Sequence, residues 1–222
     1  MRCLYHMPLS PASRKVRLVL GEKRLAYELR VENAWESGDS FLAINPSGET
    51  PALVDEEGVV VCDDVAICEY LDERYPDPPL LGSTPAERAE ARRLVAWFDR
   101  LFFGEVTQNL AGEKIFKRLA GTGAPDSARV RLGITSIRRH LDYIDYLVDR
   151  RNWLAGDSLS MADIAAAAQL STIDYAGDVP WEPHPGAHDW YARIKSRPSF
   201  RPLLQDRLAG LPPAKHYADL DF

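Results

Sequence analysis

The sequence predicts a mixed α/β domain followed by an all-helical domain, and three observations support this division. Residues 1–76 alternate between strand-like and helical patterns. A proline-dense segment at 75–82, YPDPPLLG, comes next, and such segments commonly separate domains. Beyond it, apolar residues recur at helical spacing. We therefore expect an α/β domain over residues 1–76, a linker over 77–84, a helical domain over 85–211 and a tail over 212–222.

The α/β domain should contain a βαβ unit joined to a ββα unit, which together form one mixed sheet. Apolar side chains alternate in the expected strands, and a glycine turn at Glu56–Gly58 joins two apolar runs as a hairpin. The expected elements are, in order, a strand at 2–7, a helix from Pro11, a strand at 27–31, a loop with a short helix at 33–48, a strand after Pro51, a strand at 59–61 and a helix from Asp63.

The domain after the linker should be built from helices alone. Leu94, Phe98 and Leu101 have the spacing of one helix face, and the same pattern returns further along the chain. The tail contains Pro212 and Pro213 and has no helical pattern. The expected helices start at Pro85, cover Asp126–Arg150, Met161–Tyr175 and Ala187–Ser196, and end with one near Phe200–Leu208.

The clearest local signal is a capping box at Leu159–Ile164, LSMADI. We expect the Ser160 side chain to cap the helix while the Asp163 carboxylate accepts from the Ser160 backbone N–H. Leu159 can pack on Ile164 as a hydrophobic staple. This motif predicts a helix start, and it predicts a role in folding rather than in chemistry.

Composition and charge exclude several classes of protein. The 222 residues are 45% hydrophobic and 27% charged, as in ordinary globular proteins. Residues 1–79 hold 8 Lys and Arg against 15 Asp and Glu, a net charge of −7, which disfavours binding to nucleic acid. No apolar run approaches the roughly 20 residues that span a bilayer, so we expect no direct membrane insertion. With no secretory pattern at the start, we expect a cytoplasmic protein.

The cysteines and histidines predict neither a disulfide nor a metal site. Cys3, Cys62 and Cys68 are odd in number and lack CxxC spacing, so reduced thiols are expected. His140 and His184 have no partners at metal-ligand spacing in the sequence. We therefore expect no metal.

Two positions in the α/β domain are candidates for ligand binding. Ser10 lies at the start of the first helix, where its hydroxyl could donate to a bound thiolate or could simply cap the helix. Pro51 lies between a loop and a buried strand, so a cis Thr50–Pro51 bond is expected there. The Thr50 backbone could then bind an extended peptide, or the proline could only fix the fold.

The tail and one tryptophan are candidates for binding a partner protein. In the tail, aromatic and apolar side chains alternate with carboxylates, which is typical of a docking peptide if the strip is exposed. Alternatively the tail folds back on its own domain. Trp35, in a polar loop, could be an exposed anchor or could pack over the sheet edge. The candidate tail residues are Tyr217, Asp219, Leu220, Asp221 and Phe222.

Four motifs in order and spacing resemble those of the glutathione-transferase superfamily. They are Ser10-x-x-Ser13-x-x-Val16-Arg17, Asn45-Pro46-x-Gly48-x-Thr50-Pro51, Ala66-Ile67-x-x-Tyr70-Leu71 and Gly156-x-x-x-Ser160-x-Ala162-Asp163. The resemblance implies a thioredoxin-like domain followed by an all-helical domain. It also implies that Ser10 lies at the serine-type catalytic position, and that Thr50 and Pro51 lie where the backbone holds the glutathione cysteine.

One position departs from the superfamily pattern. Serine-type transferases usually carry Glu-Ser or Asp-Ser before Ala-Ile, and that serine helps to hold a glutathione carboxylate, whereas this chain has Asp63-Asp64-Val65. Two like charges about 4 Å apart repel by roughly 1 kcal/mol in water and about 4 kcal/mol at an effective dielectric of about 20. We therefore expect Asp64 to disfavour glutathione.

A longer set of motifs is similar to the FzlA family of transferase-like bacterial division proteins. The matching segments are GEK at 21–23, RYPDPPLL at 74–81, RRLVxWFD at 92–99, RNWLAGD at 151–157, GDVPW at 177–181, the run from Trp190 to Leu204, and HYADLDF at 216–222. This resemblance implies a non-catalytic, homodimeric adaptor that binds the tubulin-like protein FtsZ at the division site, with the tail contacting the wall-synthesis machinery. The alternative is an active serine-type transferase that uses Ser10 and glutathione as its cofactor.

Overall fold

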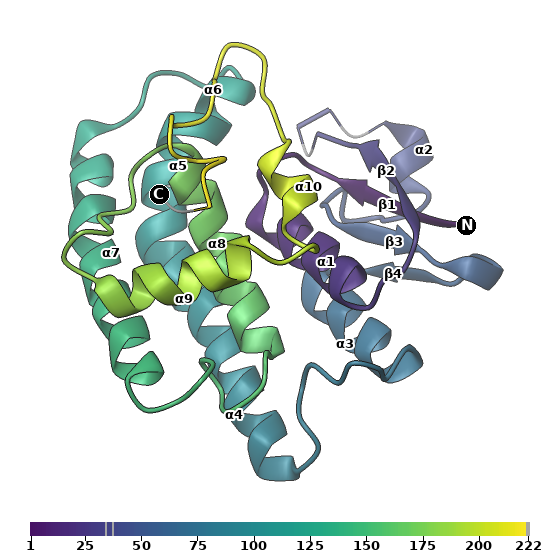
Figure 1. Ribbon diagram of the computed structural model, residues 1–222. Helices are drawn as coiled ribbons and strands as arrows, with labels where there is room; N and C mark the ends of the chain where they lie inside the picture. Colours follow the sequence, from purple (N-terminus) through teal and green to yellow (C-terminus); the bar gives the residue numbers. More distant parts are fainter. Residues whose placement is uncertain (34, 37, 221–222) are drawn as a thin grey trace.

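The computed structural model describes residues 1–33, 35–36 and 38–220, which form an α/β layer packed beside a helical bundle (Figure 1). The order and type of the elements confirm the expected thioredoxin-like domain followed by an all-helical domain. None of the helices in these described ranges has both the length and the apolar character needed to cross a membrane. Cys3, Cys62 and Cys68 are free, as expected.

The sheet of the first domain has the strand order β2-β1-β3-β4. Strand β1 pairs in parallel with β2 and antiparallel with β3, and β3 pairs antiparallel with β4. The hairpin before β4 turns at Glu57 and Gly58, which have φ of 71° and 81°. The elements are β1 (Arg2–His6), α1 (Pro11–Glu22), β2 (Tyr27–Val31), α2 (Asp39–Leu42), β3 (Ala52–Val54), η1 (Glu56–Gly58), β4 (Val60–Cys62) and α3 (Asp64–Arg74).

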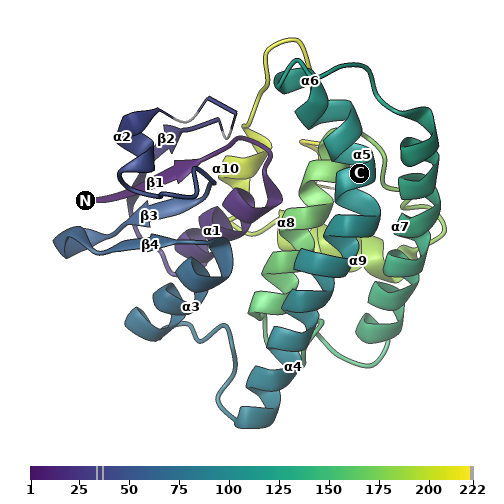
Figure 2. The same cartoon turned by 180° about the vertical axis from the view of Figure 1, so that it is seen from behind.

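The second domain begins with one long helical run that contains two π-helical segments, seen from behind in Figure 2. The sequence does not predict these segments, because a π turn keeps helical dihedral angles while its hydrogen bonds span five residues. The predicted helix near Phe200–Leu208 is shorter than expected. The elements are α4 (Pro85–Ala96), η2 (Trp97–Thr107), α5 (Gln108–Ala111), η3 (Gly112–Phe116), α6 (Lys117–Leu119), α7 (Ser127–Val148), α8 (Met161–Tyr175), α9 (Pro185–Lys195) and α10 (Arg201–Leu204).

Helix α8 lies at the centre of the molecule, and all of its residues are buried. A helix that is apolar on every side is stable only when it is covered all round. Its alanines, Ala165–Ala168, let α1 approach from one side and η2 from another. Polar contacts reinforce this packing: Arg14 donates to Ser171 Oγ at 2.8 Å, and Thr172 Oγ1 donates to the Leu9 carbonyl at 2.8 Å. The two domains therefore share one core.

The capping box at the start of α8 is confirmed. The Ser160 backbone N–H donates to Asp163 Oδ2 at 2.9 Å, and the Ser160 side chain caps the helix in return. The other carboxylate oxygen of Asp163 accepts from the Leu154 N–H and from Trp190 Nε1, both at 2.9 Å. The motif therefore also ties α8 to α9 and to the preceding loop.

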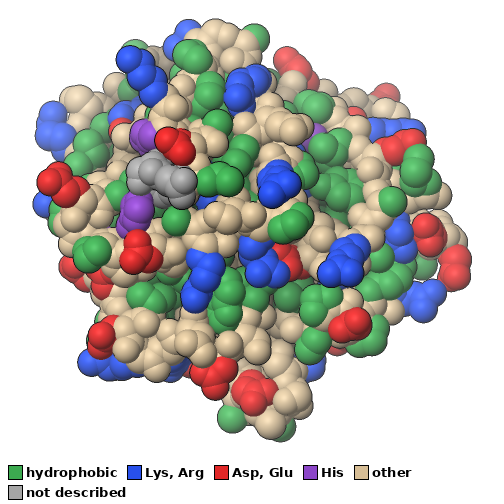
Figure 3. Space-filling model, viewed as in Figure 1, with side chains coloured by type: hydrophobic (Ala, Val, Ile, Leu, Met, Phe, Trp, Pro, Cys, Tyr) green, Lys and Arg blue, Asp and Glu red, His purple; other side chains and the backbone are tan. Residues whose placement is uncertain are grey.

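Charged side chains are distributed as the sequence indicates. The first domain carries most of the acidic excess, whereas residues 80–222 hold 19 Lys and Arg against 18 Asp and Glu. Figure 3 shows Lys and Arg side chains across the middle of the face that carries α9 and α10, with Asp and Glu mostly toward its edge.

Candidate functional site

A cavity of about 350 Å³ lies between the two domains and contains most of the predicted ligand-binding positions. The first domain contributes residues that precede or start its helices and strands. The second contributes residues from the long helical run and from α8. The lining residues are Met7, Ser10, Pro11, Ala12, Thr50, Asp64, Asp99, Phe103, Thr107, Gln108, Gly112, Phe116 and Gln169.

Ser10 lies at this cavity and also caps α1. Its Oγ accepts from the Ser13 backbone N–H at 3.4 Å, and Pro11 occupies the first helical position, where no N–H is needed. The Ser13 hydroxyl oxygen in turn accepts from the Met7 N–H at 3.2 Å. The structure therefore confirms the capping role of Ser10, while donation to a thiolate stays a prediction.

Thr50 lines the cavity from the loop that leads into β3. The Thr50–Pro51 peptide bond is cis, as the sequence predicts. Pro51 itself is buried, and Thr50 lines the cavity. Binding of a peptide backbone at Thr50 stays a prediction.

The side chain of Asp63 accepts hydrogen bonds from the backbone N–H groups at the start of α3. Its φ of 76° is a conformation that aspartate tolerates better than most residues. In this conformation its Oδ1 accepts from the N–H groups of Val65 and Ala66, at 2.9 and 3.0 Å. A carboxylate of the protein itself therefore binds where a helix start would otherwise accept an anion.

Asp63 and not Asp64 caps this helix; Asp64 is the first residue of α3, and its expected effect on glutathione binding stays a prediction. The Asp64 carboxylate points away from the cap and forms an ion pair with Lys15 Nζ at 2.5 Å. The capping geometry explains the difference, because the N-cap carboxylate is the one that reaches the free N–H groups of the first turn. Asp63 caps the helix, and Asp64 contributes charge to the cavity.

Lys15 binds Asp64 from the first domain and Asp99 from η2 in the second. Its side chain is 1% exposed, and burial alone would lower the pKa of Lys15. The carboxylates of Asp99 and Asp64 outweigh this effect and raise that pKa above its usual range. Lys15 is therefore a charged group held by both domains.

Sequence reasoning missed both Lys15 and Asp99. A signal for Lys15 was present, because it lies four residues before Val19 on the apolar face of the first helix. A lysine at such a position needs a buried partner. Asp99 had no comparable signal, because its orientation depends on the π-helical segment.

The π-helical segments direct one row of side chains into the cavity. Asp99, Phe103 and Thr107 come from η2, and Gly112 and Phe116 from η3. Their spacing of four to five residues matches the wider π turn and not the 3.6-residue α turn. Such segments often occur at functional sites, because they turn side chains that a regular helix would place elsewhere.

The expectation of an exposed aromatic strip in the tail is wrong for Tyr217. Its side chain is fully buried, its hydroxyl donates to the Leu203 carbonyl at 3.1 Å, and its ring packs edge-on against Tyr175. The Arg14 guanidinium lies 5.9 Å from the ring centroid. The alternative, a tail that folds back on its own domain, is correct for this side chain.

The remaining partner-binding candidates lie in different places. Leu220 is half-buried and packs on the core, whereas Asp219 is exposed. Asp221 and Phe222 lie outside the described residues. Trp35 is 38% exposed, far from the tail in sequence, and its role as an anchor stays a prediction.

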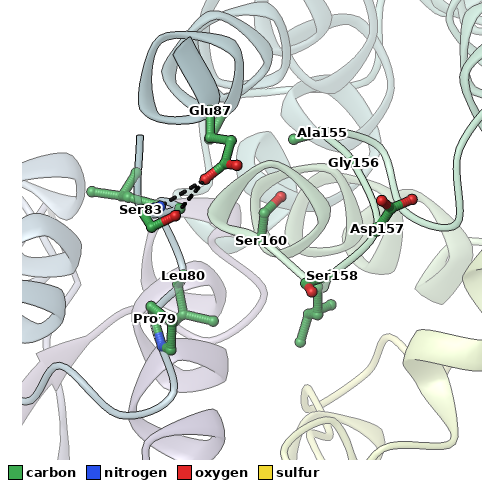
Figure 4. Close-up of a pocket in the computed structure, with 13 residues that line it drawn as sticks. Pro79, Leu80, Ser83, Glu87, Ala155, Gly156, Asp157, Ser158 and Ser160 are labelled. Carbon is green, nitrogen blue, oxygen red and sulfur yellow. Dashed lines mark hydrogen bonds between the residues drawn. The ribbon is translucent and has the colours of Figure 1, made fainter. Parts of the chain in front are cut away.

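A second hollow, of about 380 Å³, lies between the interdomain linker and the loop before α8 (Figure 4). Glu87 points into it and accepts from the Ser83 N–H and hydroxyl at 2.8 and 3.0 Å. The Ser160 hydroxyl donates to Asp163 at 2.8 Å. These polar groups cap α4 and α8, which gives them a structural role.

His184 has no partner at metal-ligand spacing in the sequence, but the fold brings two carboxylates beside it. Asp142, Asp145 and His184 bring one ligand-type atom each within 4.8 Å of one another. Asp145 also accepts from the Ala187 N–H at 2.7 Å, near the start of α9. Capping of α9 by Asp145 accounts for much of this arrangement.

Comparisons with known proteins agree with the fold. Residues 4–79 match the family model for the glutathione S-transferase N-terminal domain, and residues 127–193 match that for the C-terminal domain. The chain is 54% identical to FtsZ-localized protein A of Caulobacter vibrioides over 100% of this chain and 98% of that protein.

Two solved structures resemble the whole chain. FzlA from C. crescentus superposes with a TM-score of 0.97 at 54% identity, covering 100% of this chain and 99% of that one. A glutathione S-transferase from Rhodospirillum rubrum F11 superposes with a TM-score of 0.98 at 59% identity, covering 100% of both.

Replacing Tyr217 should test whether the tail is part of the core. We expect Tyr217→Ala to lower the free energy of unfolding by about 3–5 kcal/mol, because it empties a buried aromatic site. Tyr217→Phe should cost only about 1 kcal/mol, because it removes one hydrogen bond. Chemical denaturation measures both values, and equal, negligible losses would show that the tail is not anchored there in solution.

Proposed function

The chain belongs to the glutathione S-transferase superfamily, and we propose that it is a non-catalytic adaptor that binds FtsZ filaments. In this proposal it regulates filament curvature and constriction during bacterial cell division, in the cytoplasm at the division site. The observation that carries the proposal is its 54% identity, over the full chain, to a protein named for its localisation with FtsZ.

The geometry at the start of α3 supports a role without glutathione. Asp63 caps this helix through the N–H groups of Val65 and Ala66, in the position where the superfamily pattern also has an acidic residue, so Asp64 is the departure that bears on glutathione. Asp64 and Asp99 add negative charge to the same cavity. At about 4 Å each such charge repels an anion by roughly 1–4 kcal/mol, depending on the local dielectric.

Trp35 and the end of the tail are the proposed contact points for partner proteins. Trp35 offers a large, partly exposed aromatic side chain, the type that most often dominates interface energies. In the tail, Tyr217 is the internal anchor. The residues after it, from Asp219 onward, are proposed to contact the wall-synthesis machinery.

We include a homodimer in this proposal. The first domain and the long helical run leave apolar side chains partly exposed: Val60 on β4, Val65 on α3 and Leu101 on η2, with exposures of 47%, 40% and 37%. A second copy of the chain would remove these side chains from water, which favours association.

Co-sedimentation with GTP-assembled FtsZ tests the main proposal. We expect the protein to pellet with filaments, and Trp35→Ala to weaken this binding by about tenfold or more, as for a tryptophan anchor. Tyr146→Ala, which removes another exposed aromatic side chain, is the matched control and should pellet normally. No enrichment of the unaltered protein in the pellet would contradict the proposal.

The alternative, an active serine-type transferase, predicts a measurable effect of glutathione. A ligand at a hundredfold excess over its dissociation constant stabilises a protein by about 2.7 kcal/mol. We expect instead an unchanged melting temperature at millimolar glutathione, measured by differential scanning fluorimetry. A rise that Ser10→Ala reduces would support the transferase.

Light scattering tests the dimer. We expect a mass twice that of the 24.9 kDa chain at micromolar concentration. Leu101→Glu should shift the mass toward that of the monomer, because it would bury an uncompensated charge. A single-chain mass for the unaltered protein would exclude the dimer.

A further inference from the structure

The interdomain cavity is lined by two charged side chains, and both are acidic. Asp64 comes from the start of α3 in the first domain, and Asp99 comes from η2 in the second domain. Among the described residues that line the cavity, there is no lysine, arginine or histidine. The cavity therefore presents a negative surface to whatever enters it.

A single buried cation compensates for these two carboxylates. Lys15 contacts both from behind the cavity wall, with its side chain 1% exposed, whereas Asp64 and Asp99 remain 20% and 15% exposed. One positive charge against two carboxylates leaves an excess of one negative charge among these three side chains, and both carboxylates line the cavity. Burial, joined by the neighbouring charge of Asp64, raises the pKa of Asp99 even though Lys15 opposes this.

The rest of the lining suits a small molecule with an apolar body. Phe103 and Phe116 project from the π-helical segments, and Pro11 faces them from the start of α1. Gln169, 4% exposed, has its carbonyl oxygen occupied by Thr107 Oγ1 at 2.7 Å. Ser10, which is 7% exposed, lies at the same wall and has its hydroxyl oxygen bound by the Ser13 N–H.

We propose that this cavity binds a small organic ammonium ion. The ammonium group lies between Asp64 and Asp99 and neutralises their excess charge, and the apolar body packs against Phe103 and Phe116. A ligand that brings a further carboxylate to this position, as glutathione would, is repelled by Asp64 and Asp99. The site does not depend on FtsZ binding, so filament co-sedimentation and amine binding can fail separately.

Three probes of similar shape separate charge from apolar packing. They are 2-phenylethylamine, the neutral 2-phenylethanol and the anionic 3-phenylpropionate, titrated into the unaltered protein and followed by amide chemical shifts. We expect the amine to bind about tenfold or more tightly than the alcohol, and the acid not to bind. Equal binding of amine and alcohol, or shifts confined to residues outside the cavity, would overturn the proposal.

Substitution of the carboxylates identifies the groups involved. Asp64→Asn and Asp99→Asn each keep one carboxylate for Lys15 and should each weaken amine binding by about tenfold. Glu73→Gln removes an exposed carboxylate from the same helix as Asp64 and should leave amine affinity unchanged. An equal loss in all three variants would show only a general charge effect, and no loss in the first two would refute the site. The probe comparison on the unaltered protein decides the matter should either Asn variant fail to fold.

Discussion

The arrangement of the interdomain region depends on the ion pairs that the buried Lys15 forms with Asp64 and Asp99. A buried ammonium group is stable only with carboxylates beside it, and here the two carboxylates belong to different domains. This requirement holds α1, α3 and η2 in one arrangement. It also puts two acidic groups at a cavity that superfamily resemblance would assign to an anionic tripeptide. The cavity is therefore acidic because the fold provides two carboxylates to pair with the buried Lys15.

Much of the fold could be predicted from the sequence because its signals are local. Proline and glycine placed the turns, apolar spacing placed the helices, and Ser160 with Asp163 placed the start of α8. The site could be predicted less well from the sequence. Asp63 and Asp64 are adjacent and identical, and only the backbone conformation decides which one caps the helix. The π-helical segments have no apolar period that distinguishes them from an α-helix over so short a length.

The tail illustrates a similar limit. Its alternation of aromatic and acidic residues is consistent either with an exposed peptide or with a folded strap, and the choice depends on a distant partner. Arg14 lies fully buried under the tail, with Asp206 as an ion-pair partner at 3.0 Å and the Tyr217 ring on another side. Covering this arginine requires the tail to return to the domain interface. Tyr217 therefore belongs to the folded structure.

The complete burial of α8 also limits how such a scaffold can change during evolution. Substitutions on this helix alter the contacts of both domains at once, so neither half can be exchanged or lost as an independent module. Substitutions should be tolerated better away from this helix, at the start of α3, in the cavity-lining residues of η2 and η3, and in the tail. New contacts with other proteins can therefore arise at the surface while the central helix stays nearly unchanged.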